Sequence, residues 1–140
     1  MDSKELVREG LTALDQSADA FVEYLTEDAE FLTPFGPMQG RDQIREFIAG
    51  MHASFSDWLH DVKIESAGDL VVLEGTWNGT HSGPMQTPQG EVPATGTRAK
   101  VPFAGIVRVR GDKIASVHNY FDTGGMMGQL GLMPEAATTA

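Results

Sequence analysis

The chain has 140 residues, and its 10 Lys and Arg against 20 Asp and Glu give a formal net charge of −10. This length fits one domain, and 41% apolar with 21% charged residues is the composition of a folded globular protein. The absence of cysteine excludes disulfides, thiolate metal sites and a cysteine nucleophile. The acidic charge argues against nucleic acid or a membrane surface as a partner. Because the sequence has no long apolar run and no basic, apolar leader at its start, we expect a cytoplasmic location.

Three helices are predicted in the first part of the chain. The first follows Asp2 as its N-cap, the second opens near Asp19, and the third follows Gly40. Between the second and the third, residues 30–33 are predicted as a short strand, and residues 35–37 as a turn.

After Trp58 the apolar pattern changes to the period of two that is typical of strands. Four strands are predicted, namely His60–Ser66, Leu70–His81, Thr97–Arg110 and Lys113–Asp122. Because no strand–helix–strand alternation appears here, we expect an antiparallel sheet and the α+β class. Residues 1–133 are expected to form a single domain, with a disordered tail at 134–140.

Two connecting segments each allow two interpretations. Residues 82–96 contain three prolines and three glycines and are predicted to form a longer hairpin loop, which is either a lid or a dimer contact. Residues 123–132 alternate glycine with Met and Leu, and they form either a short closing helix or a tail laid on the sheet.

The last predicted strand carries the strongest candidate chemistry. His118, Tyr120 and Asp122 share one predicted face, and a His–Asp pair in an apolar cavity would suit proton transfer. Alternatively, this face is simply exposed to solvent, or Asp122 is the N-cap of the closing helix. His81, at the end of another strand, would complete a set of two histidines and one carboxylate, but the spacing has no local ligand motif, and no metal site is predicted. The other two histidines, His52 and His60, are expected at the surface.

Several segments, taken together in this order, resemble the SnoaL-like polyketide cyclase family of the NTF2-like superfamily. They are Trp77-Asn78-Gly79-Thr80-His81-Ser82-Gly83, Pro93-Ala94-Thr95-Gly96, the run from Ile106 to Ile114, Asp122 and Gln129-Leu130-Gly131. The resemblance implies a cone-shaped, curved antiparallel sheet that encloses an apolar pocket with about three helices, and a homodimer formed through the sheet. It also implies cofactor-free chemistry, typically an aldol-type ring closure, with Asp122 as the acid/base carboxylate, His118 as its neighbour and His81 as a polar pocket residue.

Other members of the superfamily use machinery that this sequence lacks. Limonene epoxide hydrolases pair two carboxylates through an arginine, but Gly75 and Trp77 stand at the positions of that arginine and of the second carboxylate. Phe31 and Thr33 stand where those enzymes hold the attacking water. No carboxylate stands near Thr33 to Phe35, where ketosteroid isomerases place their base.

The predicted pocket is therefore largely apolar and suits a small hydrophobic molecule. Beside His81, its predicted binding residues are Trp77, Tyr120, Phe31, Phe35, Phe47, Trp58, Phe103 and Met126. The first hypothesis is a cofactor-independent cyclase or isomerase that acts on a carbonyl-containing, polyketide-like molecule. The alternatives are a ligand-binding domain without catalysis and an enzyme that opens epoxides.

Overall fold

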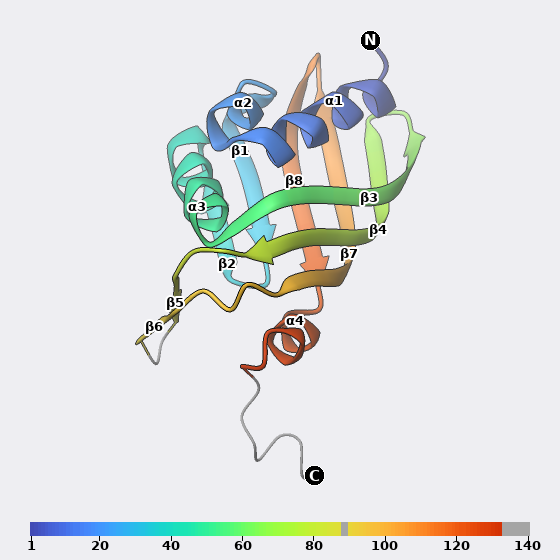
Figure 1. Ribbon diagram of the computed structural model, residues 1–140. Coiled ribbons are helices and arrows are strands. Elements are labelled where there is room, and N and C mark those ends of the chain that lie inside the picture. The colour runs from blue at the N-terminus through green and yellow to red at the C-terminus, as the bar shows by residue number, and fades with distance from the viewer. Residues whose placement is uncertain (88–89, 133–140) are drawn as a thin grey trace.

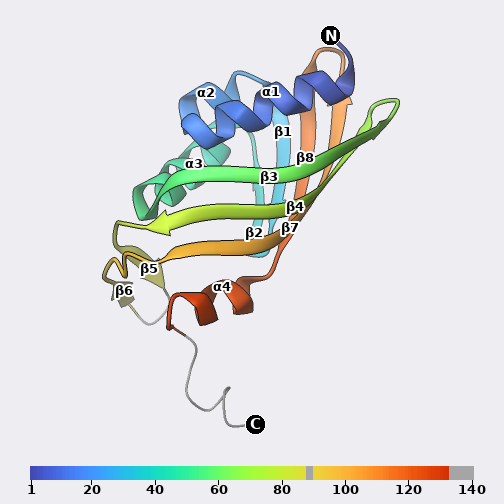
Figure 2. The same cartoon turned by 45° about the vertical axis from the view of Figure 1, so that its right-hand side comes forward.

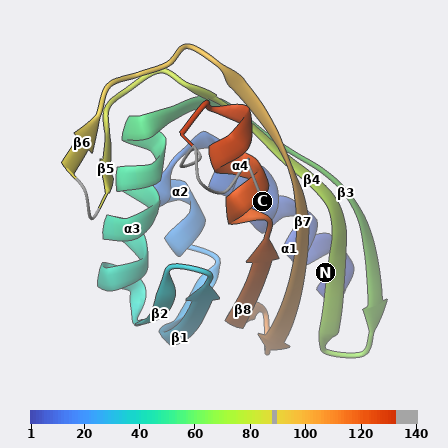
Figure 3. The ribbon, with the colours of Figure 1, turned by 90° about the horizontal axis from the view of Figure 1, so that it is seen from below.

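The computed structural model describes residues 1–87 and 90–132, and the tail expected at 134–140 lies outside them. Helices cover the concave side of a strongly curved sheet, and a short C-terminal helix lies across one end (Figures 1 and 3). The helices are α1 (Ser3–Gln16), α2 (Ala18–Val22), α3 (Arg41–Ser54) and α4 (Thr123–Gln129). The strands are β1 (Leu25–Thr33), β2 (Gly36–Gln39), β3 (Phe55–Ala67), β4 (Leu70–His81), β5 (Met85–Thr87), β6 (Gly90–Val92), β7 (Arg98–Arg110) and β8 (Lys113–Phe121).

The predicted helices are confirmed. The carboxylate of Asp2 caps α1 by accepting a hydrogen bond from the backbone N–H of Glu5 at 2.8 Å. Ser17 caps α2 in the same way, so that the two helices follow one another directly. Helix α3 has no side-chain cap at Gly40, but Arg41 in its first turn donates from Nε to the carbonyl oxygen of Leu25 at 3.1 Å. This contact fixes the start of α3 against β1.

The α+β class is confirmed, but the sheet is mixed rather than antiparallel. In the described part of the chain, six strands pair in the order β2-β1-β8-β7-β4-β3, and β1 runs parallel to β8. The other pairs in this sheet are antiparallel, and long β3, β4 and β7 curve around the helices without closing into a barrel (Figure 2). The segment predicted as a turn at 35–37 is shorter in the structure, because Gly36 and Pro37 already pair with β1 as part of β2.

Two β-bulges decide which side chains face the interior. In β3, Ser56 pairs with Thr80 and Leu59 with Asn78, so that Asp57 and Trp58 together oppose one residue of β4. Asp57 has a φ of 54°, in the left-handed region that side chains other than glycine rarely adopt. Because a bulge shifts the alternation by one residue, Trp58 faces inward, although it lies an odd number of positions from the buried Phe55.

The second bulge lies in β8. Arg108 pairs with Ser116 while Val109 pairs with Ile114, so that the intervening Ala115 is the extra residue. After it, the buried positions are odd-numbered, from Val117 onward. The inner face therefore changes from even to odd positions along this strand.

The loop predicted at 82–96 contains the small hairpin of β5 and β6, which is separate from the main sheet. The closing segment predicted at 123–132 contains α4. Within residues 1–87 and 90–132, no helix has both the length and the apolar character needed to cross a membrane.

Candidate active site

An apolar cavity of about 50 Å³ lies between the helices and the concave face of the sheet. Its walls come from both helices and strands, and they are Leu14, Phe31, Thr33, Phe47, Ile48, Met51, Trp58, His60, Trp77, Phe103, Asn119, Phe121 and Met126. Neither a lysine nor an arginine nor a carboxylate is among them. A cavity of this size has room for a few water molecules or for a small organic molecule.

Three polar groups in this wall have no protein partner. The ring Nε2 of His60, the indole N–H of Trp77 and the side-chain amide of Asn119 make no hydrogen bond with any other residue that the structure describes. The fully buried side-chain atoms without a partner in the described part of the chain are two others, Thr26 Oγ1 and His81 Nε2. Asn119 is only 7% exposed. Three polar groups without a protein partner around one cavity are free to bind a polar atom of a ligand. Thr33 is different, since its hydroxyl already accepts from the N–H of Phe35 at 3.0 Å.

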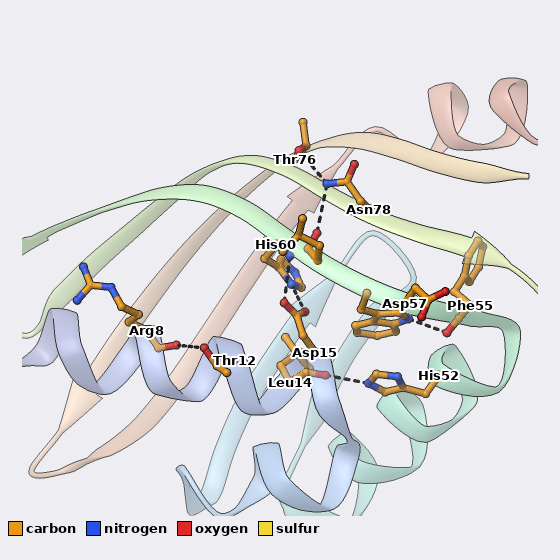
Figure 4. Close-up of polar contacts among 12 residues, drawn as sticks. Arg8, Thr12, Leu14, Asp15, His52, Phe55, Asp57, His60, Thr76 and Asn78 are labelled. Atoms are coloured by element: carbon orange, nitrogen blue, oxygen red, sulfur yellow. Dashed lines mark hydrogen bonds and ion pairs between the residues drawn. The ribbon is translucent and has the colours of Figure 1, made fainter.

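His60 is held by a carboxylate from another element. Asp15, in the last turn of α1, accepts a hydrogen bond from the backbone N–H of His60 at 3.0 Å and contacts the ring Nδ1 at 2.6 Å (Figure 4). The side chain of His60 is 3% exposed and that of Asp15 is 18% exposed. A carboxylate can only accept, so the neutral ring carries its proton on Nδ1 and leaves Nε2 as a free base.

Asp15 lies in the last turn of α1, where a negative charge destabilises the helix. A carboxylate near a helix C-terminus opposes the helix dipole, and the last turn of α1 carries no basic residue. His52 of α3 compensates in part, because its Nε2 donates to the carbonyl oxygen of Leu14 at 2.8 Å (Figure 4). The same ring stacks on Trp58 with 3.9 Å between the ring centroids. The end of α1 is thereby fixed beside the cavity wall.

Of the three unpaired polar groups, His60 and Trp77 are adjacent, whereas Asn119 lies two strands from β4 and level with Leu73, four residues from Trp77. His60 and Trp77 are direct partners in the β3–β4 ladder. Asn119 lies on β8 opposite Gly105, and a Cβ atom at Gly105 would approach Asn119 Oδ1 to 3.2 Å. Gly105 therefore leaves the room that the amide of Asn119 occupies. Gly79 has a similar role for Trp77, because a Cβ atom at Gly79 would lie 2.7 Å from the indole ring.

Most of the apolar residues predicted for the pocket line this cavity. They are Phe31, Phe47, Trp58, Trp77, Phe103 and Met126. Phe35 does not line it, since it is 50% exposed in the turn between β1 and β2. Its ring packs against two lining residues from outside, at 6.2 Å from Phe47 and 5.7 Å from Phe121 between centroids.

The predicted face of His118, Tyr120 and Asp122 is not in the cavity. The bulge at Ala115 turns His118 and Tyr120 to the outer face of the sheet, where Tyr120 is 50% exposed. His118 Nε2 lies 3.0 Å from Glu30 Oε1 on the neighbouring strand β1. Asp122 is exposed, and its Oδ1 accepts from the N–H of Gly125 at 2.8 Å as the N-cap of α4. The pairing of Asp122 with His118 inside a pocket is therefore wrong in its geometry.

His81 is fully buried but lies outside the cavity wall. Its Nδ1 accepts from the N–H of Thr95 at 3.2 Å, and its ring stacks on Phe55 with 5.2 Å between centroids. Burial lowers the pKa of His81, because the charged ring would lose its hydration, and the backbone of Gly83 raises it by a smaller amount. Among residues 1–87 and 90–132, no three His, Asp or Glu side chains are grouped so that they could hold a metal ion.

Sequence reasoning missed Asp15, His60 and Asn119. His60 was expected at the surface, yet it shares the parity of the half-buried Val62 and Ile64 in β3, and this signal was available. Asn119 was assigned to the strand face opposite His118, which the bulge turns inward. Asp15 had no local signal, since its partner lies 45 residues away.

The fold is an α+β arrangement of helices on a curved, unclosed sheet, with an apolar cavity between the two. A family profile described as the SnoaL-like domain matches residues 7–117, and the chain belongs to this family. Among curated protein sequences, none matches the chain.

Solved structures share the fold over nearly the whole chain. A protein of ketosteroid isomerase-like fold from Catenulispora acidiphila, in complex with trimethylamine, is 26% identical with a TM-score of 0.77, over 92% of this chain and 94% of that one. Candidate polyketide cyclases from Pseudomonas putida and Xanthomonas campestris are 23% and 24% identical, with TM-scores of 0.80 and 0.81. They cover 92% and 91% of this chain, over 98% and 96% of their own chains. These neighbours confirm the NTF2-like fold that the sequence predicted.

Proposed function

We propose that this protein is a cofactor-independent isomerase or cyclase for a small, neutral, hydrophobic carbonyl compound, with His60 as its base. The observation that carries the proposal is the orientation of the His60 ring. Its Nδ1 is held by Asp15 at 2.6 Å, its Nε2 has no partner among the described residues, and the residue lines an apolar cavity. The family supports a cyclase or isomerase of this general kind.

The proposed chemistry begins with a proton next to a carbonyl group. The C–H bond breaks, its proton moves to Nε2 of His60, and its electron pair moves onto the carbonyl oxygen. The negative charge of Asp15 stabilises the imidazolium that forms. Return of the proton to another carbon completes an isomerisation. In a cyclisation, the new carbon nucleophile instead attacks a second carbonyl carbon, and the resulting oxyanion takes the proton.

The developing oxyanion needs hydrogen-bond donors that are already in place. Asn119 and Trp77 supply an amide N–H and an indole N–H in the same cavity wall, and neither donates elsewhere among the described residues. A neutral ligand is expected, because no lysine or arginine lines the cavity to balance a charged group. The many aromatic rings favour a ligand with little polar surface.

The test is the exchange of α-protons of 2-butanone in D₂O, followed by proton NMR. A positioned general base contributes about 10²–10⁴-fold, so the wild-type protein is expected to accelerate exchange over buffer by about this factor. His60→Gln keeps a polar side chain of similar reach but removes the base, and its rate is expected to fall to that of buffer. Equal rates for the variant and the wild type would contradict the proposal.

A second candidate function is binding without turnover. It is favoured by the relative from Catenulispora acidiphila, which holds trimethylamine, and by the aromatic rings around this cavity. Aromatic faces attract organic ammonium groups through cation–π interactions. Titration with trimethylamine, followed by tryptophan fluorescence, tests this candidate, since both tryptophans of the chain, Trp58 and Trp77, line the cavity. Tight binding without any ketone exchange would favour it over catalysis.

The proposed assembly is a homodimer through the outer face of the sheet. This face exposes large apolar side chains on three strands, with Leu59 52%, Val72 41% and Tyr120 50% exposed. Val72 and Tyr120 lie two strands apart and Leu59 lies further along β3, so a second copy of the sheet could cover all three only with a broad contact. Sedimentation of the wild type and of Val72→Glu tests this proposal, and a monomeric wild type would contradict it.

A further inference from the structure

Helix α4 closes one end of the cavity. Figure 3 shows it lying across the open end of the cone, beside β7 and β8. Its residue Met126 is 1% exposed and belongs to the cavity wall. The other walls come from long strands and from the longer helices α1 and α3, so α4 is the shortest helix or strand that contributes to the site.

The helix is held in place by its contacts rather than by its own stability. It has seven residues, of which Gly124, Gly125 and Gly128 disfavour a helix, and so short a helix does not form alone. At its end, the amide of Gln129 donates to the carbonyl oxygen of Lys100 and accepts from its N–H, both at 2.7 Å. The pairing of β7 with β8 ends at Phe103 and Phe121. Beyond that pair, the amide of Gln129 makes the two backbone hydrogen bonds with Lys100 that a neighbouring strand would otherwise make.

Met126 therefore occupies space that a larger ligand would need. The cavity of about 50 Å³ beside it suits a molecule of a few heavy atoms. Methionine is unbranched and flexible, so its side chain can be displaced more readily than an aromatic ring of the sheet. The neighbouring Met127 is only half-buried and does not line the cavity.

We propose that Met126 is a specificity-determining residue, which restricts this site to small ketones by filling the α4 end of the cavity. The inference rests on the proposed function for the identity of the ligand class, but the size limit is a property of the cavity itself. A bicyclic aromatic ketone enters only when the Met126 side chain moves away. A small aliphatic ketone binds with Met126 in place.

The test compares 2-butanone with 2-tetralone in the wild type, Met126→Ala and the matched control Met127→Ala. Binding is read from the fluorescence of Trp58 and Trp77, and turnover from α-proton exchange in D₂O. Pockets discriminate about 10–200-fold per methylene-sized difference, so Met126→Ala is expected to shift the affinity ratio toward 2-tetralone by at least about tenfold. Met127→Ala is expected to leave the ratio unchanged.

An unchanged ratio in a folded Met126→Ala variant would overturn the inference, and so would an equal shift in Met127→Ala. Circular dichroism shows whether Met126→Ala folds. If it does not, Met126→Val removes less volume and is expected to shift the affinity ratio in the same direction. An unshifted ratio in Met126→Val would also overturn the inference. A shifted binding ratio without ketone exchange in any variant would leave the size limit standing and refute the proposed function. Exchange of 2-butanone that depends on His60, together with an unshifted affinity ratio, would support the proposed function and refute the size limit set by Met126.

Discussion

Asp15 binds His60 through both of its carboxylate oxygens, at 3.0 Å from the backbone N–H and at 2.6 Å from the ring Nδ1. The backbone bond fixes the carboxylate, and the fixed carboxylate sets the tautomer of the ring. The pair joins α1 to β3 at a wall of the cavity. The packing of the first helix thereby determines which ring nitrogen of His60 is left without a protein partner.

The first prediction concerns Asp15→Asn. The backbone N–H of His60 requires an acceptor, so the amide oxygen takes that position and the amide NH₂ faces Nδ1. Nδ1 must then accept, and the ring proton moves to Nε2, where it blocks the base. We expect ketone exchange to fall by up to about 10⁴-fold, as when a triad histidine takes the wrong tautomer. Nitrogen-15 NMR of the imidazole provides the check, and a proton retained on Nδ1 together with full activity would refute the interpretation.

The second prediction concerns Asn119→Leu. Loss of one oxyanion donor is expected to lower exchange by about 10²–10³-fold. Because the buried amide has no protein partner, its replacement by an apolar group of similar shape is expected to leave the free energy of unfolding unchanged or to raise it by about 1 kcal/mol. Urea denaturation measures the stability and NMR the exchange. A strongly destabilised variant would show that the amide has a structural partner.

The third prediction concerns Asp122, the N-cap of α4. Asp122→Ala is expected to destabilise the protein by about 1 kcal/mol, whereas Asp122→Asn still caps the helix and retains most of the stability. Ketone exchange by Asp122→Asn is expected to match that of the wild type. A loss of exchange in a stable Asp122→Asn variant would instead support the sequence-based hypothesis that this carboxylate transfers the proton.

The fourth prediction concerns pH. The pKa of His81 is lowered in the folded protein by burial, from an ordinary value of 6.5, so in mildly acidic solution the unfolded chain binds a proton that the folded chain does not. Stability contributed by the neutral ring is complete above about pH 6.5 and is lost as the pH falls toward the folded pKa, with a slope of at most about 1.4 kcal/mol per pH unit.

Urea denaturation between pH 5 and pH 7.5 checks this slope. His81→Gln has no titrating ring, so it is expected to show a flatter dependence than the wild type over this range. The remaining histidines are common to both proteins and cancel in the comparison. Parallel curves for the two proteins would show that His81 does not contribute.

Much of the fold could be predicted from the sequence, because its signals are local. The N-cap at Asp2 and the period of two from β3 onward act within a few residues, and the two hairpin turns have glycines, Gly68 and Gly111, with φ of 63° and 66°. The parallel pairing of β1 with β8 was missed, since it joins strands that are distant in the sequence. The apolar lining was largely predicted because large aromatic side chains are usually buried, whatever the details of the fold.

The polar part of the site could not be predicted in the same way. A single extra residue at a bulge exchanges the two faces of a strand, and period-two patterns do not reveal it. The bulge at Ala115 placed Asn119 inside and His118 outside, and the bulge at Asp57 made Trp58 and His60 inward-facing. The carbonyl oxygen of Asp57 accepts from Arg98 Nη1 at 3.0 Å, a contact between residues 41 positions apart that no local pattern indicates.

The most direct test of the central claim compares the two candidate bases in one assay. α-Proton exchange of 2-butanone in D₂O is measured for the wild type, His60→Gln and His118→Gln, which make the same substitution in the cavity wall and on the outer face of the sheet. We predict that His60→Gln falls to the rate of buffer, a loss of about 10²–10⁴-fold, while His118→Gln retains the wild-type rate. Retention of activity by His60→Gln together with its loss in His118→Gln would contradict the assignment of His60 as the base.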